Sequence, residues 1–272
     1  MQQSVLFKMD WYTYFNGLAA MLMFGVIGWL ISLYRNNVTH VDSMWSLFFL
    51  VAAGSYVYNI DASHLSVMGS RAILMLTLLT VWALRLCIYL TWRNWGPHED
   101  HRYAAIRANN EPHFKFKSLY IIFGLQAVLA WMISLPIFGA LHANTTFNFL
   151  DVIGALLVLY GLIWETLADW QLSRFKANIS HKGKVLNTGV WRYSRHPNYF
   201  GESCVWWGFY LIALAAGAWW ALPSAILMTL LLLKVSGVSL LEKDIAERRP
   251  EYLKYIKTTN AFIPGFPKGD YR

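Results

Sequence analysis

The sequence predicts an all-α integral membrane protein with about seven transmembrane helices, an outside N-terminus, a cytosolic C-terminus and a C-terminal amphipathic helix. Hydrophobic residues make up 57% of the 272 residues and charged residues only 14%, whereas about 25% are charged in typical soluble domains. The 14 tryptophans and 15 tyrosines suit the membrane–water interface. The formal net charge of +8 then indicates basic loops that face anionic lipid or an anionic cofactor, and not nucleic acid.

Seven apolar segments approach the roughly 20 residues that a membrane-spanning helix needs. The first lacks an obvious small-residue cleavage site after its short N-terminus, so we expect a span and not a signal peptide. The last two are divided at the sequence GAWW, which predicts a tight helical hairpin. The segments cover residues 13–34, 41–60, 69–91, 118–141, 149–170, 201–217 and 219–237.

The distribution of Lys and Arg predicts the orientation. With seven spans, nearly all of the 23 Lys and Arg residues fall in loops 92–117 and 171–200, in the tail, or at Arg35. Lys8 and Arg71 fall on the other side, and Arg85 lies within a span. The positive-inside rule therefore places the long loops in the cytosol, at the inner membrane if the host is bacterial.

The sequence GVWRYSRHPNYFGE, residues 189–202, directly precedes the sixth apolar segment. Pro197 suits the first turn of a helix, whose unpaired N–H groups would add to Arg192, Arg195 and His196 to form an anion site. Glu202 at the mouth of a span is costly unless it is paired or functional. The alternative is an interfacial belt in which the arginines contact lipid phosphates.

A second polar group closes the fifth segment, in WETLADWQLSRFK. Glu165 and Asp169 are four residues apart and so share one helical face, and Arg174 and Lys176 follow them. The two carboxylates could hydrogen-bond to a ribose or an amide, and the two cations could bind a phosphate. The alternative is an ordinary polar helix end.

Polar residues also occur in the N-terminal half. Arg85 and Tyr89 lie one turn apart in the third segment, and Asp42 at the start of the second is a plausible partner for Arg85. An intramembrane arginine indicates pairing or function. The loop after the third segment predicts a polar cluster of Glu99, Asp100, Arg102 and Tyr103.

The tail has apolar residues at helical spacing over 238–256, which predicts an amphipathic helix that binds lipid or closes over a site. Glu242 and Asp244 are its candidate carboxylates. The sequence has no phosphate-binding loop. It also has no histidine pair at metal-binding spacing, so no metal site is expected.

These segments together resemble bacterial membrane proteins of unknown function that are related to the C-terminal domain of steroid 5-alpha-reductases. The resemblance covers about residues 38–264 and rests on the sequences HVDSMWS, LRLCIYLTWRNWGPHEDHRY, ADWQLSRFK, KGKVLNTGVWRYSRHPNYFGE and LLEKDIAERRPEYLKYIKTTNAFIP. The wider superfamily includes sterol reductases and isoprenylcysteine carboxyl methyltransferases.

The resemblance implies that NADPH binds among the cytosolic ends of the C-terminal helices. It implies a three-span substrate-side region over 1–117 and a cofactor-binding region over 118–272 within one membrane domain. The implied cofactor contacts are Glu165, Asp169, Arg174, Lys176, Lys184, Arg192, Tyr193, Arg195, His196, Asn198, Tyr199 and Glu242.

The same resemblance implies catalytic roles for Tyr89, Glu202 and Asp42. Tyr89 matches a tyrosine that polarises the substrate carbonyl in steroid reductases. Two positions depart from that family: Glu165 stands where it has asparagine, and Lys176 where it has arginine. The glutamine–glutamate pair that steroid reductases use near the substrate has no clear counterpart, which argues against a 3-keto steroid.

The expected function is NADPH-dependent reduction of the enone double bond of a steroid-like or isoprenoid-like lipid. The Arg-His-Pro-x-Tyr sequence over 195–199 is also typical of membrane methyltransferases that use S-adenosylmethionine. A non-enzymatic protein that binds membrane lipids is the third interpretation.

Overall fold

The computed structural model describes residues 9–60, 69–142, 145–235 and 251–268. Within these ranges the chain forms helices and no strands. The chain divides into two compact units: unit 1 comprises Met1–Asn148 and Ile212–Ala221, and unit 2 comprises Phe149–Leu211 and Leu222–Arg272. The all-helical prediction is therefore confirmed for the described residues.

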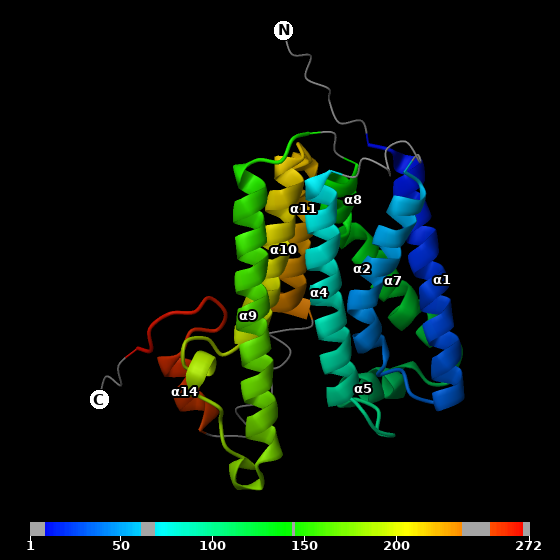
Figure 1. The fold of residues 1–272 in the computed structure, drawn as a ribbon. Helices are drawn as coiled ribbons and strands as arrows, with labels where there is room; N and C mark the ends of the chain where they lie inside the picture. The colour runs from blue at the N-terminus through cyan, green and yellow to red at the C-terminus, as the bar shows by residue number, and fades with distance from the viewer. Residues whose placement is uncertain (1–8, 61–68, 143–144, 236–250, 269–272) are drawn as a thin grey trace. The chain divides into compact units, whose positions relative to one another are not determined.

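Unit 1 contains helices that run side by side, with one short helix across their end (Figure 1). Asp10 caps the first helix by accepting a hydrogen bond from the Thr13 backbone N–H at 3.2 Å. Short α5 lies at the end where α1 and α4 terminate (Figure 1). The helices are α1 (Trp11–Arg35), α2 (Val41–Tyr58), α4 (Ser70–Arg93), α5 (His101–Asn110), α6 (Phe114–Ser118), the π-helical η1 (Leu119–Gly124), α7 (Leu125–Ile133), α8 (Leu135–Leu141) and the short η4 (Trp219–Ala221).

Small residues and paired hydroxyl groups hold the core of unit 1 together. A Cβ added at Gly17 would lie 2.4 Å from the Tyr56 ring, so α1 approaches α2 closely. The Tyr56 hydroxyl lies 2.6 Å from the Ser134 Oγ, and the Tyr14 hydroxyl donates to the Trp131 carbonyl at 2.8 Å. These hydrogen bonds satisfy polar groups that would be costly to bury alone in apolar surroundings.

The segment predicted as one span over 118–141 is helical but not one regular α-helix. It begins with α6 and η1, continues as α7 to Ile133, and resumes as α8 at Leu135. Pro136 stands in the first turn of α8, where its missing N–H is tolerated, whereas in a helix interior it would break the hydrogen-bond ladder.

Unit 2 is built around a close contact between two helices. A Cβ at Gly201 would lie 2.8 Å from the Gly161 carbonyl oxygen, and a Cβ at Gly208 would lie 2.7 Å from the Gly154 carbonyl oxygen. Such small residues let two backbones approach as in membrane helix pairs. The helices are α9 (Phe149–Ala177), η2 (Ile179–His181), η3 (Gly189–Arg192), α10 (Pro197–Ala215, to Leu211 within this unit), α11 (Leu222–Leu230), the π-helical η5 (Leu231–Val235) and α14 (Tyr252–Thr258).

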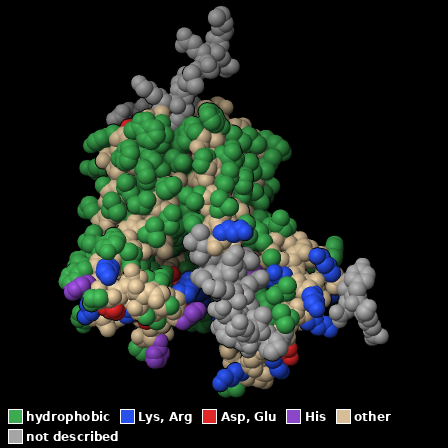
Figure 2. Space-filling model, turned by 180° about the vertical axis from the view of Figure 1, so that it is seen from behind, with side chains coloured by type: hydrophobic (Ala, Val, Ile, Leu, Met, Phe, Trp, Pro, Cys, Tyr) green, Lys and Arg blue, Asp and Glu red, His purple; other side chains and the backbone are tan. Residues whose placement is uncertain are grey.

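Four helical segments are long and apolar enough to cross a membrane: Trp11–Arg35, Ser70–Arg93, Phe114–Ile133 and Phe149–Ala177. Only 28% to 33% of the residues in their apolar windows are buried, so most residues in these windows are at least partly exposed. Figure 2 shows hydrophobic side chains covering the helical part of one face, with charged and histidine side chains near the helix ends. Together these features suggest an integral membrane protein.

The remaining predicted spans are also helical but shorter or less apolar. The helices α2 and α10 cover two of them, and Trp219–Lys234 is a shorter apolar helix. The turn expected at GAWW is present: α10 ends at Ala215, and Gly217 has a φ of +84°, a left-handed conformation that glycine adopts readily. Glu242 and most of the predicted amphipathic helix lie outside the described residues, and α14 covers the end of that prediction.

Candidate functional site

The Arg-His-Pro segment of unit 2 is buried. Helix α10 begins at Pro197, as the sequence predicted. Ser194 is fully buried, and Arg195 and His196 are 8% and 5% exposed. The His196 ring stacks on Tyr199, with 5.7 Å between the ring centroids and an interplanar angle of 2°. The burial of these residues argues against a simple belt of lipid contacts.

Hydrogen bonds tie this segment to the chain after α14. The Arg195 Nη1 donates to the carbonyl oxygens of Thr259 at 2.5 Å and Ile256 at 3.2 Å, and the Arg195 backbone N–H donates to the Asn260 carbonyl at 2.9 Å. The Ser194 Oγ donates to the Phe262 carbonyl at 2.7 Å. Arg195 thus helps to position the C-terminal segment, a role that its place in the sequence did not predict.

Three predicted carboxylates of unit 2 are also buried. Glu165 is 2% exposed, Asp169 is 4% exposed and Glu202 is 8% exposed. A Cβ at Gly201 would lie 2.7 Å from the Glu165 backbone nitrogen, and the Asn198 Nδ2 donates to the Asp169 Oδ1 at 3.4 Å. The two sequence motifs that suggested a cofactor site therefore meet in space. Buried carboxylates need polar partners, so packing and not solvent decides what these three side chains contact.

The predicted cations of unit 2 are mostly at the surface. The Arg174 guanidinium lies over the Trp170 ring, 5.0 Å from its centroid. The Tyr193 carbonyl accepts a hydrogen bond from the Gly265 N–H at 3.0 Å, so this residue also contacts the C-terminal segment. The four exposed cations are Arg174, Lys176, Lys184 and Arg192.

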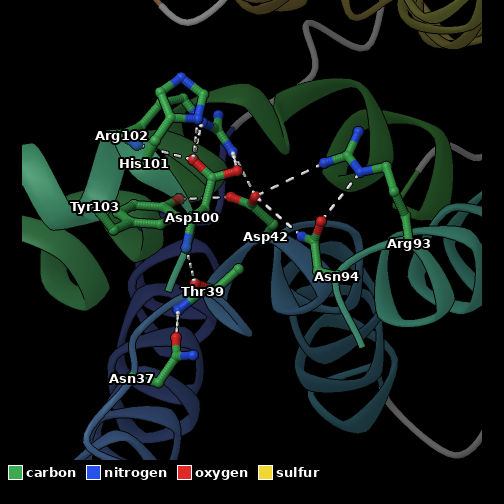
Figure 3. A network of polar contacts seen from close by, with 9 residues as sticks. All are labelled: Asn37, Thr39, Asp42, Arg93, Asn94, Asp100, His101, Arg102 and Tyr103. Atoms are coloured by element: carbon green, nitrogen blue, oxygen red, sulfur yellow. Dashed lines mark hydrogen bonds and ion pairs between the residues drawn. The ribbon is translucent and has the colours of Figure 1, made fainter. Parts of the chain in front are cut away.

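A separate polar network in unit 1 centres on Asp42 (Figure 3). Its Oδ1 accepts a hydrogen bond from the Tyr103 hydroxyl at 2.5 Å, and its Oδ2 accepts one from the Arg102 Nη2 at 2.7 Å. The Asn94 Nδ2 lies 3.4 Å from the same Oδ2, and an Arg93 nitrogen lies 3.9 Å from it. Helix α5 and the end of α4 thus supply the contacts of Asp42 (Figure 3).

The predicted partner of Asp42, Arg85, lies deeper in α4 and contacts a different side chain. Its guanidinium lies 5.5 Å from the centroid of the Tyr89 ring, and the Arg93 guanidinium lies 5.8 Å from the same centroid. Two cations therefore flank Tyr89, the residue that the resemblance implied as catalytic.

A second ion pair fixes the connection between α4 and α5. Arg107 donates from Nη2 and Nε to the two Glu99 oxygens at 2.7 and 2.8 Å, while Glu99 Oε1 accepts from the Val38 N–H at 3.0 Å. The Asp100 N–H donates to the Thr39 Oγ1 at 2.9 Å. The connection between α1 and α2 is therefore bonded to the loop before α5, which the sequence did not predict.

Electrostatics keep this network charged. Burial opposes ionisation of Asp100, but hydrogen bonds from Arg102 outweigh it and lower the pKa of the carboxyl group. The same balance, with Arg107 as the main partner, lowers the pKa of Glu99. Burial and the neighbouring Asp42 raise the pKa of Tyr103 well above its usual value, so this phenol stays protonated and donates to the carboxylate.

The described residues hold both acidic and basic side chains at the candidate site. Among them, no group of three or more His, Cys, Asp and Glu side chains is arranged to hold a metal ion. Buried carboxylates beside exposed cations provide acceptors for hydroxyl groups and charges for phosphates. Glu242, the remaining predicted cofactor contact, lies outside the described residues.

Comparison with known proteins places the chain in a family. No solved structure shows a significant match to it. An uncharacterised protein of Schizosaccharomyces pombe is 27% identical over an alignment of 284 residues. The match covers 91% of this chain and 78% of the relative. That relative is fungal, so similar sequences extend beyond the bacterial proteins that the sequence resembled. The model of a family described as Protein of unknown function (DUF1295) matches residues 28–259, and the protein belongs to this family.

Proposed function

We propose that this protein is a membrane-embedded, NADPH-dependent reductase that acts on the enone double bond of a lipid-like substrate, steroid-like or isoprenoid-like. One observation carries the proposal. The buried pair Glu165 and Asp169 meets the start of α10 through Gly201 and Asn198, and Arg174 and Lys176 follow in the last turn of α9. This is the juxtaposition of hydroxyl acceptors and phosphate-binding charges that a dinucleotide requires.

Each group in unit 2 has a distinct part in cofactor binding. Glu165 and Asp169 would accept hydrogen bonds from ribose hydroxyl groups. The exposed Arg174, Lys176, Lys184 and Arg192 would neutralise phosphates, and the extra phosphate of NADPH suits this number of cations better than cationic S-adenosylmethionine does. Arg195 and His196 would keep the start of α10 in place, since Arg195 bonds the C-terminal segment.

The substrate side of the proposal lies in unit 1. NADPH would supply a hydride to the β carbon of the enone, so the carbonyl oxygen would gain the negative charge of an enolate, and a proton added at the α carbon would complete the reduction. A positioned donor stabilises such an oxygen. Tyr89 has a hydroxyl group for this task, and the two guanidinium groups beside its ring would stabilise negative charge. Asp42 would orient the groups around it. Glu202, which belongs to unit 2, is a further candidate acid.

The proposal includes seven spans with the C-terminus in the cytosol, where NADPH is present. Within unit 1, Arg35 and Arg93 stand in the last turns of α1 and α4, and α5 adds Arg102 and Arg107. Arg71, at the opposite end of α4, is only 3% exposed and donates to the Thr145 and Thr146 carbonyls. The exposed charge of this unit therefore favours the cytosolic placement that the positive-inside rule predicts.

The proposed kinship with steroid 5-alpha-reductases guides the choice of substrate. The missing glutamine–glutamate pair argues against a 3-keto steroid as the substrate. The methyltransferase and the non-enzymatic lipid-binding interpretations make different predictions about the cofactor.

The test is thermal stabilisation of the purified full-length protein in lipid nanodiscs. NADPH, NADH and S-adenosylmethionine are added at equal concentrations, because a ligand that binds only the folded state raises Tm. We expect NADPH to raise Tm more than NADH, with no effect of S-adenosylmethionine. Stabilisation by S-adenosylmethionine alone would identify a methyltransferase and refute the proposal, and no response to any of the three would favour a lipid-binding protein.

A further inference from the structure

Two adjoining cavities lie at the end of α4 in unit 1. The first is an open groove of about 500 Å³ lined by Cys87, Ile88, Thr91, Trp92 and Trp95. The second is a small pocket of about 40 Å³ whose lining includes Arg35, Ser43, Thr91, Asn94 and Trp95. Because Thr91 and Trp95 line both, the groove and the pocket are neighbours.

The groove is apolar and opens outward. Ile88, Trp92 and Trp95 are 68%, 64% and 82% exposed, and they belong to or directly follow a helix that is long and apolar enough to cross a membrane. An exposed apolar groove along such a helix suits a flexible hydrocarbon chain. Its occupant would therefore be a lipid tail.

The pocket, in contrast, is lined by several polar side chains, some with unused hydrogen-bonding capacity. Within the described ranges, Arg35 forms no hydrogen bond or ion pair, and the hydroxyl groups of Ser43 and Thr91 form no hydrogen bond. The neighbouring arginines differ from Arg35, because Arg102 and Arg107 each pair with a carboxylate at 2.7 Å. Arg35 is thus a cation available to a ligand anion.

The carboxylates near the pocket do not compete for Arg35. Asp42 and Asp100 are bonded to Arg102, and Glu99 is bonded to Arg107. Asn94, which lines the pocket, lies beside Asp42 in this network (Figure 3). Arg93 also lies 3.9 Å from Asp42, so the three carboxylates are matched by three arginines, and the charge of Arg35 is left for the pocket.

The size of the pocket limits the ligand head group. A volume of about 40 Å³ holds about three water-sized atoms. A carboxylate has three such atoms and matches a guanidinium by forming paired hydrogen bonds, whereas a phosphate ester is larger. A hydroxyl group would fit but would leave the Arg35 charge unpaired.

We propose that unit 1 binds a single-chain lipid acid, with its carboxylate beside Arg35 and its hydrocarbon chain along the groove of α4. The inference concerns binding and goes beyond the proposed reductase activity. It requires no cofactor, so it can fail or hold independently of NADPH binding.

Photolabelling of the full-length protein in phosphatidylcholine nanodiscs tests the proposal. The probes are hexadecanoic acid with a diazirine in mid-chain and the corresponding hexadecanol, and mass spectrometry locates the labelled residues. We expect the acid to label residues 87–95 saturably, with competition by excess unlabelled hexadecanoic acid. We expect Arg35→Gln to weaken this labelling about tenfold, since it removes a charge-assisted hydrogen bond, and Lys115→Gln, at an exposed cation in α6, to leave it unchanged.

A second variant tests the groove itself. Trp95→Ala should reduce labelling by the acid without changing the chromatographic behaviour of the protein, because this side chain is 82% exposed. Equal labelling by the alcohol, or acid labelling spread evenly over the exposed faces of α1 and α9, would show only annular lipid and overturn the proposal. Stronger competition by hexadecyl phosphate than by hexadecanoic acid would refute the carboxylate assignment.

Discussion

Replacement of one glycine in α10 tests whether close packing of two helices positions the candidate cofactor site. In Gly201→Ala, the new Cβ would lie 2.7 Å from the Glu165 backbone nitrogen and 2.8 Å from the Gly161 carbonyl oxygen. Backbone atoms cannot rotate away, so α9 and α10 must separate until these contacts reach an ordinary distance of about 3.4 Å. Overpacking of this kind costs roughly 1–3 kcal/mol, and it moves Glu165 away from the start of α10.

Two assays measure the consequences. A cost of about 2 kcal/mol corresponds to a decrease in Tm of roughly 4–8 °C for a chain of this size. Displacement of a proposed cofactor contact should also weaken NADPH binding, seen as a smaller rise in Tm when NADPH is added. Thermal unfolding in nanodiscs with and without NADPH gives both values.

The matched control is Gly54→Ala in α2. A Cβ at Gly54 meets no atom within 4 Å, so the same substitution in another helix should be neutral or stabilise by a few tenths of a kcal/mol through lower backbone entropy in the unfolded chain. If Gly201→Ala unfolds at the wild-type temperature, or if Gly54→Ala is equally destabilised, the packing argument is wrong.

Three further predictions concern the polar networks. Arg195→Ala should decrease the rise in Tm caused by NADPH, because the segment held by Arg195 would loosen. As a control, Arg107→Ala should lower Tm without NADPH but keep the rise that NADPH causes. If both variants lose the NADPH-dependent rise equally, Arg195 has no special role. The pKa of Asp100 is lowered in the folded state, so this carboxylate stabilises the fold above the unfolded pKa near 4, and the stabilisation is lost as pH falls through the lower folded pKa. Between pH 6 and pH 3, Tm should therefore decrease less in Asp100→Asn than in the wild type. Parallel curves of Tm against pH would refute this. Tyr103→Phe removes a donor to the Asp42 carboxylate and should destabilise by roughly 1.5–3 kcal/mol, as measured by thermal unfolding; no change in Tm would show that the hydrogen bond contributes nothing.

Local features of the site could be predicted because they depend on residues close together in the sequence. Helix geometry alone places Glu165 and Asp169 on one face, and both are buried on α9. Proline chemistry alone predicts a helix start at Pro197, where α10 begins. The interruption before α8 also had a local signal in Pro136, which the long apolar run obscured.

Contacts across long distances in the sequence could not be predicted in this way. The bond of the Thr39 hydroxyl to the Asp100 N–H joins two loops separated by a whole helix hairpin. The sequence paired Asp42 with Arg85 by residue type, but the depth of each residue along its helix decides the contact. The hydrogen bonds of Arg195 to carbonyls near residue 259 have no sequence signal, because every residue carries a carbonyl group.

The sequence by itself determined the apolar helices, their approximate bounds and the asymmetry of charge, because hydropathy and helical period are properties of contiguous residues. Only the tertiary structure decided which charges are available to ligands. Arg102, Arg107 and Arg195 are occupied by protein acceptors, while Arg35 forms no hydrogen bond or ion pair with the described residues. The reason is physical: an arginine becomes a binding group or a structural one according to the carboxylates and carbonyls that packing brings within hydrogen-bonding distance.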